Sequence, residues 1–203
     1  MKSINALVIK LLPCYRRNKN RTYIVGDTYL NPSDKFVYLI KLVLSPRTTD
    51  KMVFENMKSL GSPKSIKDVS LEKLNNWEIK GFKTLKDRAI NIYQNWDVYK
   101  DYKTLENLTK IKGVGRKIAS IYLNSVYGEP RIAIDTHVFQ FIRKYFGIKT
   151  NDQVYGEEIL KQHCDKKYHI LLHNMLYRIN KFRCSGALDY CIECDKILKE
   201  YNL

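Results

Sequence analysis

The stretch Leu108-Thr-Lys-Ile-Lys-Gly-Val-Gly-Arg-Lys-Ile-Ala119 places two short apolar patterns on either side of a Gly-Val-Gly turn. Leu108 and Ile111 recur at helical spacing before the turn, and Ala119 continues the pattern after it. Glycines between two such patterns separate one helix from the next. The spacing therefore predicts a helix-hairpin-helix motif, in which the two helices pack against each other.

The turn of this hairpin has the features of a phosphate-binding site. Gly113 and Gly115 carry no side chain that would block the approach of a nucleic-acid backbone, and glycine tolerates an unusual φ. Together with Val114 they would offer backbone N–H groups, to which the following helix adds the positive end of its dipole. Arg116 adds a cation. We interpret the turn as a DNA-binding element; a plain tight turn between two helices is the alternative.

The composition favours a polyanionic partner. The 203 residues include 36 Lys and Arg against 21 Asp and Glu, a formal net charge of +15. A Lys-rich bias of the genome would give the same excess, so charge alone does not decide. No run reaches the eighteen or so apolar residues of a membrane span, and no secretion signal follows the amphipathic pattern at 4–12. We expect no membrane association and an intracellular location wherever the DNA is: nucleoid, nucleus or viral replication site.

Helical periodicity dominates the rest of the chain and predicts an all-α fold. Capping residues open helices that we expect at 34–44, 49–60, 70–81 and 83–99. After Pro130, a candidate lobe boundary, we expect helices at 135–145, 152–163 and 168–181, followed by a short tail that contains cysteines.

Lys117 is a candidate nucleophile. It lies in the first turn of the second hairpin helix, where Arg116 and the positive end of the helix dipole favour its neutral amine. A neutral amine can attack C1′ of a sugar and form a Schiff base. The alternative is an exposed lysine that contacts phosphate.

Asp135, in the stretch Ile134-Asp-Thr-His137, is a candidate carboxylate. Its position just before an apolar helix predicts an N-cap. A carboxylate at a helix N-terminus stays ionised, so it would stabilise oxocarbenium charge or move protons as a base departs. The two roles are compatible.

With these residues in view, the chain resembles the endonuclease III family of helix-hairpin-helix DNA glycosylases and AP lyases. The stretches Ile111-Lys-Gly-Val-Gly-Arg-Lys-Ile-Ala119 and Ala133-Ile-Asp-Thr-His137 match signature stretches of the family. Val43-Leu-Ser-Pro-Arg-Thr-Thr-Asp50 is similar to the family's Leu-Leu-Ser-x-Gln-x-Thr-Asp segment, and Gly81-Phe82 falls where the family has a Gly-Leu loop. The resemblance covers most of the chain.

The resemblance implies base-excision repair of double-stranded damaged DNA by a bifunctional DNA glycosylase and AP lyase. Lys117 would be the Schiff-base nucleophile and Asp135 the catalytic carboxylate, acting on a base flipped out of the duplex. The implied substrates are oxidised pyrimidines, and β-elimination then breaks the strand on the 3′ side. The presence of Lys117 speaks against the adenine-glycosylase branch of the family, which lacks this lysine.

Two departures from the family affect the predicted DNA contacts. Arg47 stands where the family has Gln, and Phe82 where it has Leu, so a cation and an aromatic ring would occupy or stack in the space that the base vacates. A surface arginine and a partly buried loop phenylalanine are the alternatives. Lys112 also replaces the usual proline of the hairpin. These departures leave the preferred damaged base open.

The cysteine tail leaves the cofactor open as well. Cys184, Cys191 and Cys194 have the C-x6-C-x2-C spacing of the family's first three iron–sulfur ligands, but Glu200 stands where the fourth cysteine would fall. Three states remain: a cluster with Glu200 or another unusual fourth ligand, a zinc site of three cysteines and a histidine such as His163, and a metal-free tail.

The resemblance also implies the domain organisation. We expect a six-helix barrel with the hairpin at 30–129 and a second helical lobe made by 1–29 together with 130–203, with DNA in the cleft between them. We expect a monomer. Two alternatives from other classes are a helix-hairpin-helix DNA-binding protein without catalysis and an AP lyase without base excision.

Overall fold

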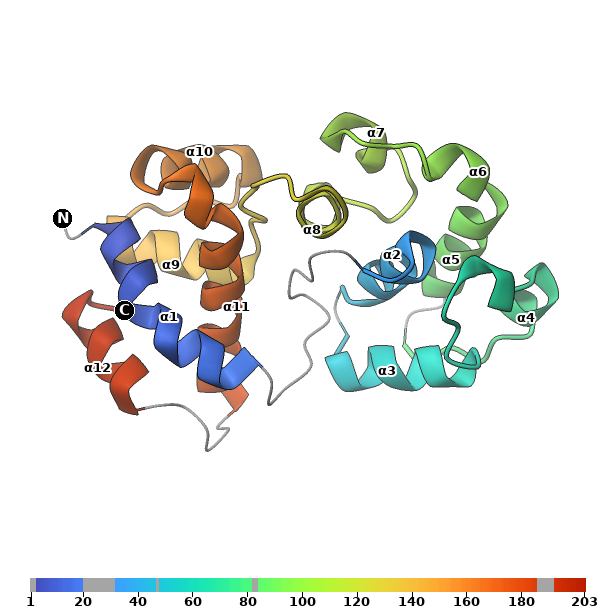
Figure 1. Ribbon diagram of the computed structural model, residues 1–203, viewed down its shortest axis with the longest axis horizontal. Helices are drawn as coiled ribbons and strands as arrows, with labels where there is room; N and C mark the ends of the chain where they lie inside the picture. The colour runs from blue at the N-terminus through green and yellow to red at the C-terminus, as the bar shows by residue number, and fades with distance from the viewer. Residues whose placement is uncertain (1–2, 20–31, 47, 82–83, 186–191) are drawn as a thin grey trace. The chain divides into compact units, whose positions relative to one another are not determined.

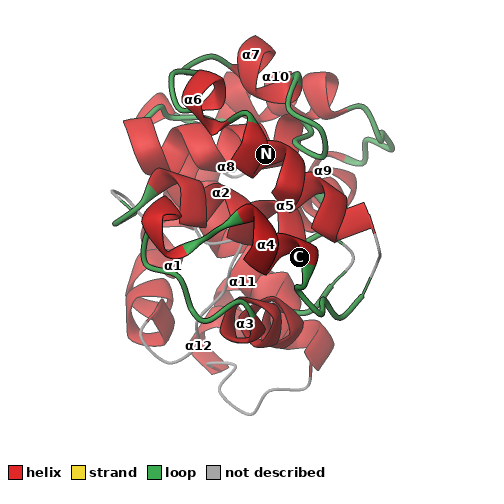
Figure 2. Ribbon diagram, turned by 90° about the vertical axis from the view of Figure 1, so that its right-hand side faces the viewer, coloured by secondary structure: helices red, strands yellow, loops and turns green. Residues whose placement is uncertain are grey.

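The chain folds into helices, as expected. The computed structural model describes residues 3–19, 32–46, 48–81, 84–185 and 192–203. Within these ranges every regular element is a helix and no strand occurs (Figures 1 and 2). In the same ranges, no helix is long and apolar enough to cross a bilayer. The all-α prediction is therefore confirmed.

The chain divides into two compact units, which are described separately. One consists of Met1–Tyr23 and Pro130–Leu203, and the other of Ile24–Glu129. We call the first the terminal unit and the second the hairpin unit. The terminal unit thus combines the two ends of the chain, whereas the hairpin unit is one continuous segment.

The hairpin unit is built around one nearly fully buried helix. In α2 (Lys35–Leu44), every residue except Lys35 and Lys41 is buried, and Asp34 caps its first turn by accepting a hydrogen bond from Val37 N–H at 2.9 Å. Around it, α2 packs against α3, α5 and α8, and the Tyr38 hydroxyl meets Ser125 of α8 at 2.7 Å. The other helices described in this unit are α3 (Asp50–Ser59), the 3-10 turn η1 (Ile66–Asp68), α4 (Leu71–Asn75), α5 (Thr84–Gln94), α6 (Trp96–Tyr99), α7 (Leu105–Thr109) and α8 (Arg116–Tyr127).

The terminal unit joins both chain ends in one apolar core. The helix α1 (Ile4–Lys19) packs against α11 (His169–Ser185) and α12 (Ile192–Glu200), and α9 (Thr136–Phe146) packs against α11 and α10 (Gln153–His163). A short 3-10 turn, η2 (Lys166–Tyr168), leads into α11. Apolar side chains from all five helices meet in the core, among them Leu7, Phe141, Leu160, Leu172 and Leu198.

Two helix lengths differ from the prediction. The helix expected at 70–81 ends at Asn75, and the Asn56 side chain of α3 binds both backbone groups of Lys80 in the chain after it. The single helix expected at 83–99 is divided at Asn95 into α5 and α6. There the Asn95 side chain donates to Asn91 O at 2.9 Å, and Trp96 packs edge-on against Phe36. Side chains that hydrogen-bond to the backbone one turn earlier commonly bend helices.

Candidate active site

The predicted helix-hairpin-helix is present in the hairpin unit. Short α7 and longer α8 pack together around the buried side chains of Leu108, Ile111 and Val114 (Figure 1). The turn is closed by backbone hydrogen bonds from Ile111 N–H to Leu108 O at 3.1 Å and from Val114 N–H to Ile111 O at 2.9 Å. Val114 therefore uses its amide and its side chain inside the hairpin, where it fixes the shape of the turn.

The two hairpin glycines have different reasons to be glycine. Gly113 has a φ of +90°, which side chains rarely tolerate, and a Cβ there would lie 2.4 Å from Cδ of Arg88. Gly115 has an ordinary φ of −81°, and a Cβ at this position would meet no atom of the described residues within 4 Å. Thus Gly113 is required by the fold of the hairpin. Gly115 leaves open space in front of the N-terminus of α8, where it is the N-cap and supplies no capping side chain.

Arg88 is a site residue that sequence reasoning did not find. It belongs to α5, yet its side chain lies against Gly113, so its Cγ, Cδ and Nε are all within 3 Å of where a Cβ would be. The arginine thus adds a cation beside the turn. Only the tertiary structure brings α5 to the hairpin, and no spacing rule links positions 88 and 113.

Lys117 lies in the first turn of α8, as predicted. Its side chain is partly buried, and it follows the exposed N-cap Gly115 by two residues. The helix dipole and Arg116 both place positive charge near this amine. This is the setting that the sequence indicated for a nucleophilic lysine.

Asp135 belongs to the terminal unit and is 7% exposed. It is the N-cap of α9, and its Oδ1 accepts hydrogen bonds from His137 N–H at 2.9 Å and Val138 N–H at 3.0 Å. These bonds confirm the predicted cap. Two amide donors and the positive end of α9 are the kind of surroundings that attract a negative charge.

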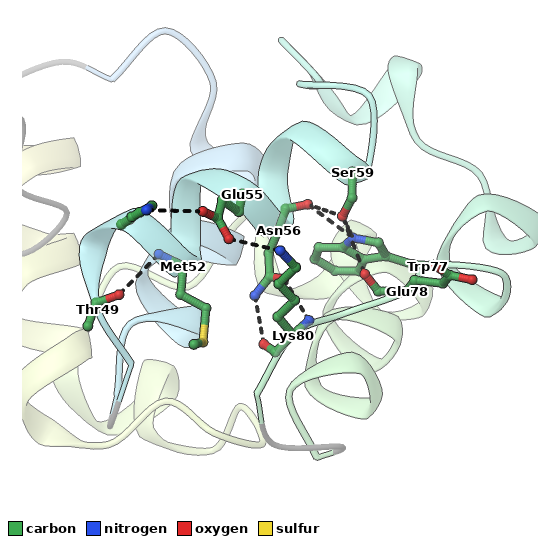
Figure 3. A network of polar contacts seen from close by, with 9 residues as sticks. Thr49, Met52, Glu55, Asn56, Ser59, Trp77, Glu78 and Lys80 are labelled. Atoms are coloured by element: carbon green, nitrogen blue, oxygen red, sulfur yellow. Dashed lines mark hydrogen bonds and ion pairs between the residues drawn. The ribbon is translucent and has the colours of Figure 1, made fainter.

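Two predicted DNA-contact residues, Arg47 and Phe82, lie outside the described residues. The segment just before Phe82 is described and is strongly held, as Figure 3 shows. The Asn56 side chain donates to Lys80 O at 3.0 Å and accepts from Lys80 N–H at 2.8 Å. The indole of Trp77 donates to Asn56 O at 3.0 Å and to Ser59 Oγ at 2.9 Å. The chain is thereby fixed up to Gly81.

The described part of the cysteine tail does not by itself form a metal site. Cys194 is 5% exposed and is packed in the core of the terminal unit. Cys191 and the side chain of Cys184 lie outside the described residues. Among the described side chains, no three of His, Cys, Asp and Glu lie together as metal ligands would. We therefore assign no step to a cluster or a zinc ion.

The two other candidate ligands have different partners. Glu200 Oε2 lies 2.7 Å from Lys10 Nζ, an ion pair that links α12 to α1. The ring of His163 packs against Phe146, with 4.9 Å between centroids. The role of Glu200 as a fourth ligand stays a prediction, and in this structure its carboxylate is paired with Lys10.

Comparison with known proteins relates the chain to endonuclease III. No protein-family profile matches the chain. Endonuclease III of Rickettsia prowazekii (strain Madrid E) is 30% identical over 185 residues, which are 86% of this chain and 86% of that protein. Endonuclease III of Haemophilus influenzae is 29% identical over 180 residues, 82% of this chain and 83% of that one.

Solved structures show the same fold. A trapped endonuclease III–DNA covalent intermediate matches with a TM-score of 0.68 at 22% identity and covers 97% of this chain and 99% of that chain. The 3-methyladenine DNA glycosylase of H. pylori, bound to 1,N6-ethenoadenine, matches with a TM-score of 0.63 at 16% identity and covers 89% of this chain and 99% of that one.

The helical fold and its hairpin are those of the helix-hairpin-helix DNA glycosylases. Within this class, the chain is 30% identical to an endonuclease III over most of both chains. The chain belongs to the endonuclease III family, and it is a DNA-binding base-excision repair enzyme with glycosylase and AP lyase activity.

Proposed function

We propose that the chain removes oxidised pyrimidines from double-stranded DNA and cuts the strand at the resulting abasic site, as a monomer inside the cell. Lys117 is the nucleophile and Asp135 the catalytic carboxylate. The observation that carries the proposal is the position of Lys117, in the first turn of α8 directly after a hairpin whose Gly113 has a φ of +90°.

The proposed reaction begins with attack of Lys117 Nζ on C1′ of the damaged nucleotide. The N-glycosidic bond breaks, and the base leaves with the bonding electron pair and takes up a proton. The sugar ring opens as the C1′–Nζ bond becomes a protonated Schiff base. Loss of a proton from C2′ then expels the 3′ phosphate oxygen with the C3′–O bond electrons. The Asp135 carboxylate would stabilise the positive charge at C1′ and accept or return protons.

DNA binding in this proposal relies on the hairpin and on nearby cations. The open space in front of Gly115 and the N-terminus of α8 support a phosphate position there. Gly113 and Val114 hold the turn, and Arg116 adds charge. Arg47 and Phe82 complete the proposed set on the basis of the sequence alone: they would fill the space that the flipped base leaves.

Borohydride trapping tests the proposal. The protein is incubated with a duplex that contains thymine glycol, and a second duplex that contains an abasic site serves for comparison. We expect a covalent adduct and strand cleavage with both, because reduction fixes the Schiff base. Lys117→Ala should abolish the adduct, whereas Lys112→Ala, at an exposed position one turn before the helix, should keep it.

Each alternative gives a different result in the same assay. Binding without adduct on either duplex would indicate a DNA-binding protein without catalysis. Adduct and cleavage with the abasic duplex alone would indicate a lyase that does not excise thymine glycol. An adduct that persists in Lys117→Ala would show that another amine is the nucleophile.

A further inference from the structure

The segment 130–135, which leads to Asp135, is held by side chains from two other helices. It has no regular secondary structure, and three of its backbone carbonyls lie within hydrogen-bond distance of side chains. His173 meets Ala133 O at 2.7 Å, His169 meets Pro130 O at 3.2 Å, and Gln153 donates to Ile134 O at 3.1 Å. Every residue in this arrangement belongs to the terminal unit.

His173 is the central contact of the three. It is fully buried, at 0% exposure, in the second turn of α11. A carbonyl oxygen only accepts, so the ring donates from Nδ1 to Ala133 O. The bond is short, and Ala133 lies two residues before Asp135. A shift of the backbone at Ala133 would therefore also move the Asp135 carboxylate.

Neighbouring contacts restrict the same segment on both sides. The ring of His169, 5% exposed, also lies 3.0 Å from Cys164 O through its second nitrogen, so it connects the segment to the chain before η2. The ring of Tyr177 stacks on His173 with 6.2 Å between centroids and meets the ring of His137 edge-on at 5.3 Å. Thus α11 contacts the chain before Asp135 and the residue two positions after it.

Packing against the apolar core alone would not require these hydrogen bonds. The segment already buries Ile132, Ala133 and Ile134 in apolar surroundings, and these side chains would seat it on the core. Apolar contacts are non-directional, however, whereas a hydrogen bond from a buried ring fixes the position of one atom. A buried histidine is costly unless it is bonded, so its presence here indicates a requirement for position.

We propose that His173, assisted by Gln153 and His169, is a positioning residue that sets the place of the Asp135 carboxylate for catalysis. This inference rests on the proposed role of Asp135. His173 does not touch the substrate. It acts by fixing the Ala133 carbonyl, and with it the start of α9, so that Oδ1 of Asp135 stays on the amides of its cap while the carboxylate meets the reacting sugar.

Two substitutions of His173 separate the hydrogen bond from the bulk of the ring. His173→Leu keeps an apolar side chain but loses the donor, whereas His173→Asn keeps an N–H close to the place of Nδ1. Because a misplacement of about 1 Å can cost about a hundredfold in rate, we expect His173→Leu to lower the single-turnover cleavage rate by roughly 10- to 100-fold. His173→Asn should restore most of that loss.

Binding and stability are measured on the same proteins. The dissociation constant for a duplex with a tetrahydrofuran abasic analogue should stay within about twofold of the unchanged protein, because the loss is in the transition state alone. Met175→Ala is the matched control: it is buried on the same helix, costs stability, and contacts the segment through no hydrogen bond. At a temperature where both variants are folded, Met175→Ala should cleave at the normal rate.

A double-mutant cycle with Asp135→Asn decides between positioning and general structural damage. Asn still caps α9, so the fold is kept while the charge is lost. If His173 acts through Asp135, adding His173→Leu to Asp135→Asn should change the cleavage rate by less than about twofold. An undiminished further loss in the double variant would overturn the proposal.

The proposed function can fail separately from this inference. If Asp135→Asn alone cleaved at the normal rate, the catalytic role of Asp135 would be wrong, and that result needs no His173 variant. If His173→Leu did not fold, Gln153→Met would replace it, because Gln153 is partly exposed and methionine has the same length without the donor. In that case, a folded Gln153→Met protein that cleaves at the normal rate would overturn the proposal.

Discussion

The hairpin around Gly113 and the segment that leads to Asp135 both supply a proposed catalytic residue, but they are built differently. The hairpin is shaped by contacts over a few residues, such as Val114 N–H to Ile111 O and the positive φ of Gly113. The segment before Asp135 is held from forty residues away, by His173, and by Gln153 at the start of α10. One is local, and the other is long-range.

The difference has a consequence for mutation. A local turn fails when its own residues change, because its shape depends on backbone angles that few side chains tolerate. A segment held at a distance fails when a residue far away in the sequence changes, although its own residues are intact. Substitutions can therefore test which description holds for each region.

The largest effect is expected at Asp135, where charge and capping can be separated. Asp135→Asn keeps the cap and should lower the single-turnover cleavage rate by about 10²- to 10⁴-fold, the usual range for a group that moves protons or stabilises charge. Asp135→Ala should lose activity to a similar degree and also about 1 kcal/mol of stability, because both amide bonds of the cap are lost. Rates and urea unfolding measure the two parts; a stable, fully active Asn variant would contradict the assignment.

The two hairpin glycines should respond differently to alanine. Gly113→Ala should cost roughly 2–3 kcal/mol in the free energy of unfolding, because alanine is strained at a φ of +90° and its Cβ would meet Arg88. Gly115→Ala should cost under about 1 kcal/mol, since its φ is ordinary and the space is open, but it should weaken binding to duplex DNA.

Arg88→Ala sharpens this comparison. In a protein that already carries Arg88→Ala, Gly113→Ala should cost less free energy of unfolding. The collision of the new Cβ with Arg88 is then absent, and only the strain from the positive φ remains. Urea unfolding and a DNA-binding titration are measured on Gly113→Ala, Gly115→Ala, Arg88→Ala and the double variant Arg88→Ala/Gly113→Ala. Equal losses for both glycines would mean that the hairpin is not held by Gly113 in the way described.

Asn56 gives a smaller, long-range test in the hairpin unit. Asn56→Ala removes both hydrogen bonds to Lys80 and should cost about 1–3 kcal/mol, because two backbone groups lose their partners. Glu55→Gln is a control in the same network: it weakens the exposed ion pairs with Lys80 at 3.1 Å and Lys51 at 4.0 Å, which should change stability by under about 0.5 kcal/mol. Denaturant unfolding distinguishes them, and equal effects would refute the central role of Asn56.

The smallest effect is expected at the ion pair between α1 and α12. Glu200→Gln should cost about 0.2–1 kcal/mol and less at high salt, because both side chains are about half exposed. Iron, sulfide and zinc analysis of anaerobically purified protein adds a second measurement. The metal content should be the same with and without Glu200→Gln, and a loss of metal in the variant would make Glu200 a ligand after all.

Several features were accessible from residue order alone. The hairpin, the cap by Asp135 and the helix starts at Asp34, Thr49 and Ser70 were all predicted, because each depends on residues within one or two turns. Glycine, capping and apolar spacing act over that range and leave a direct mark in the sequence. The family resemblance came from the same local stretches, and the comparisons confirm it.

Other features depended on partners far away in the chain. The helix that was expected to reach residue 81 stops at Asn75, and Asn56 binds Lys80 in the chain after it through a bond that no local pattern announces. Arg88 beside Gly113 and His173 beside Ala133 are of the same kind. Residue order thus indicated the groups that we propose carry the chemistry, since these lie in short motifs. Tertiary structure alone decided what holds those groups in place, because a hydrogen bond between distant residues exists only once the chain has folded.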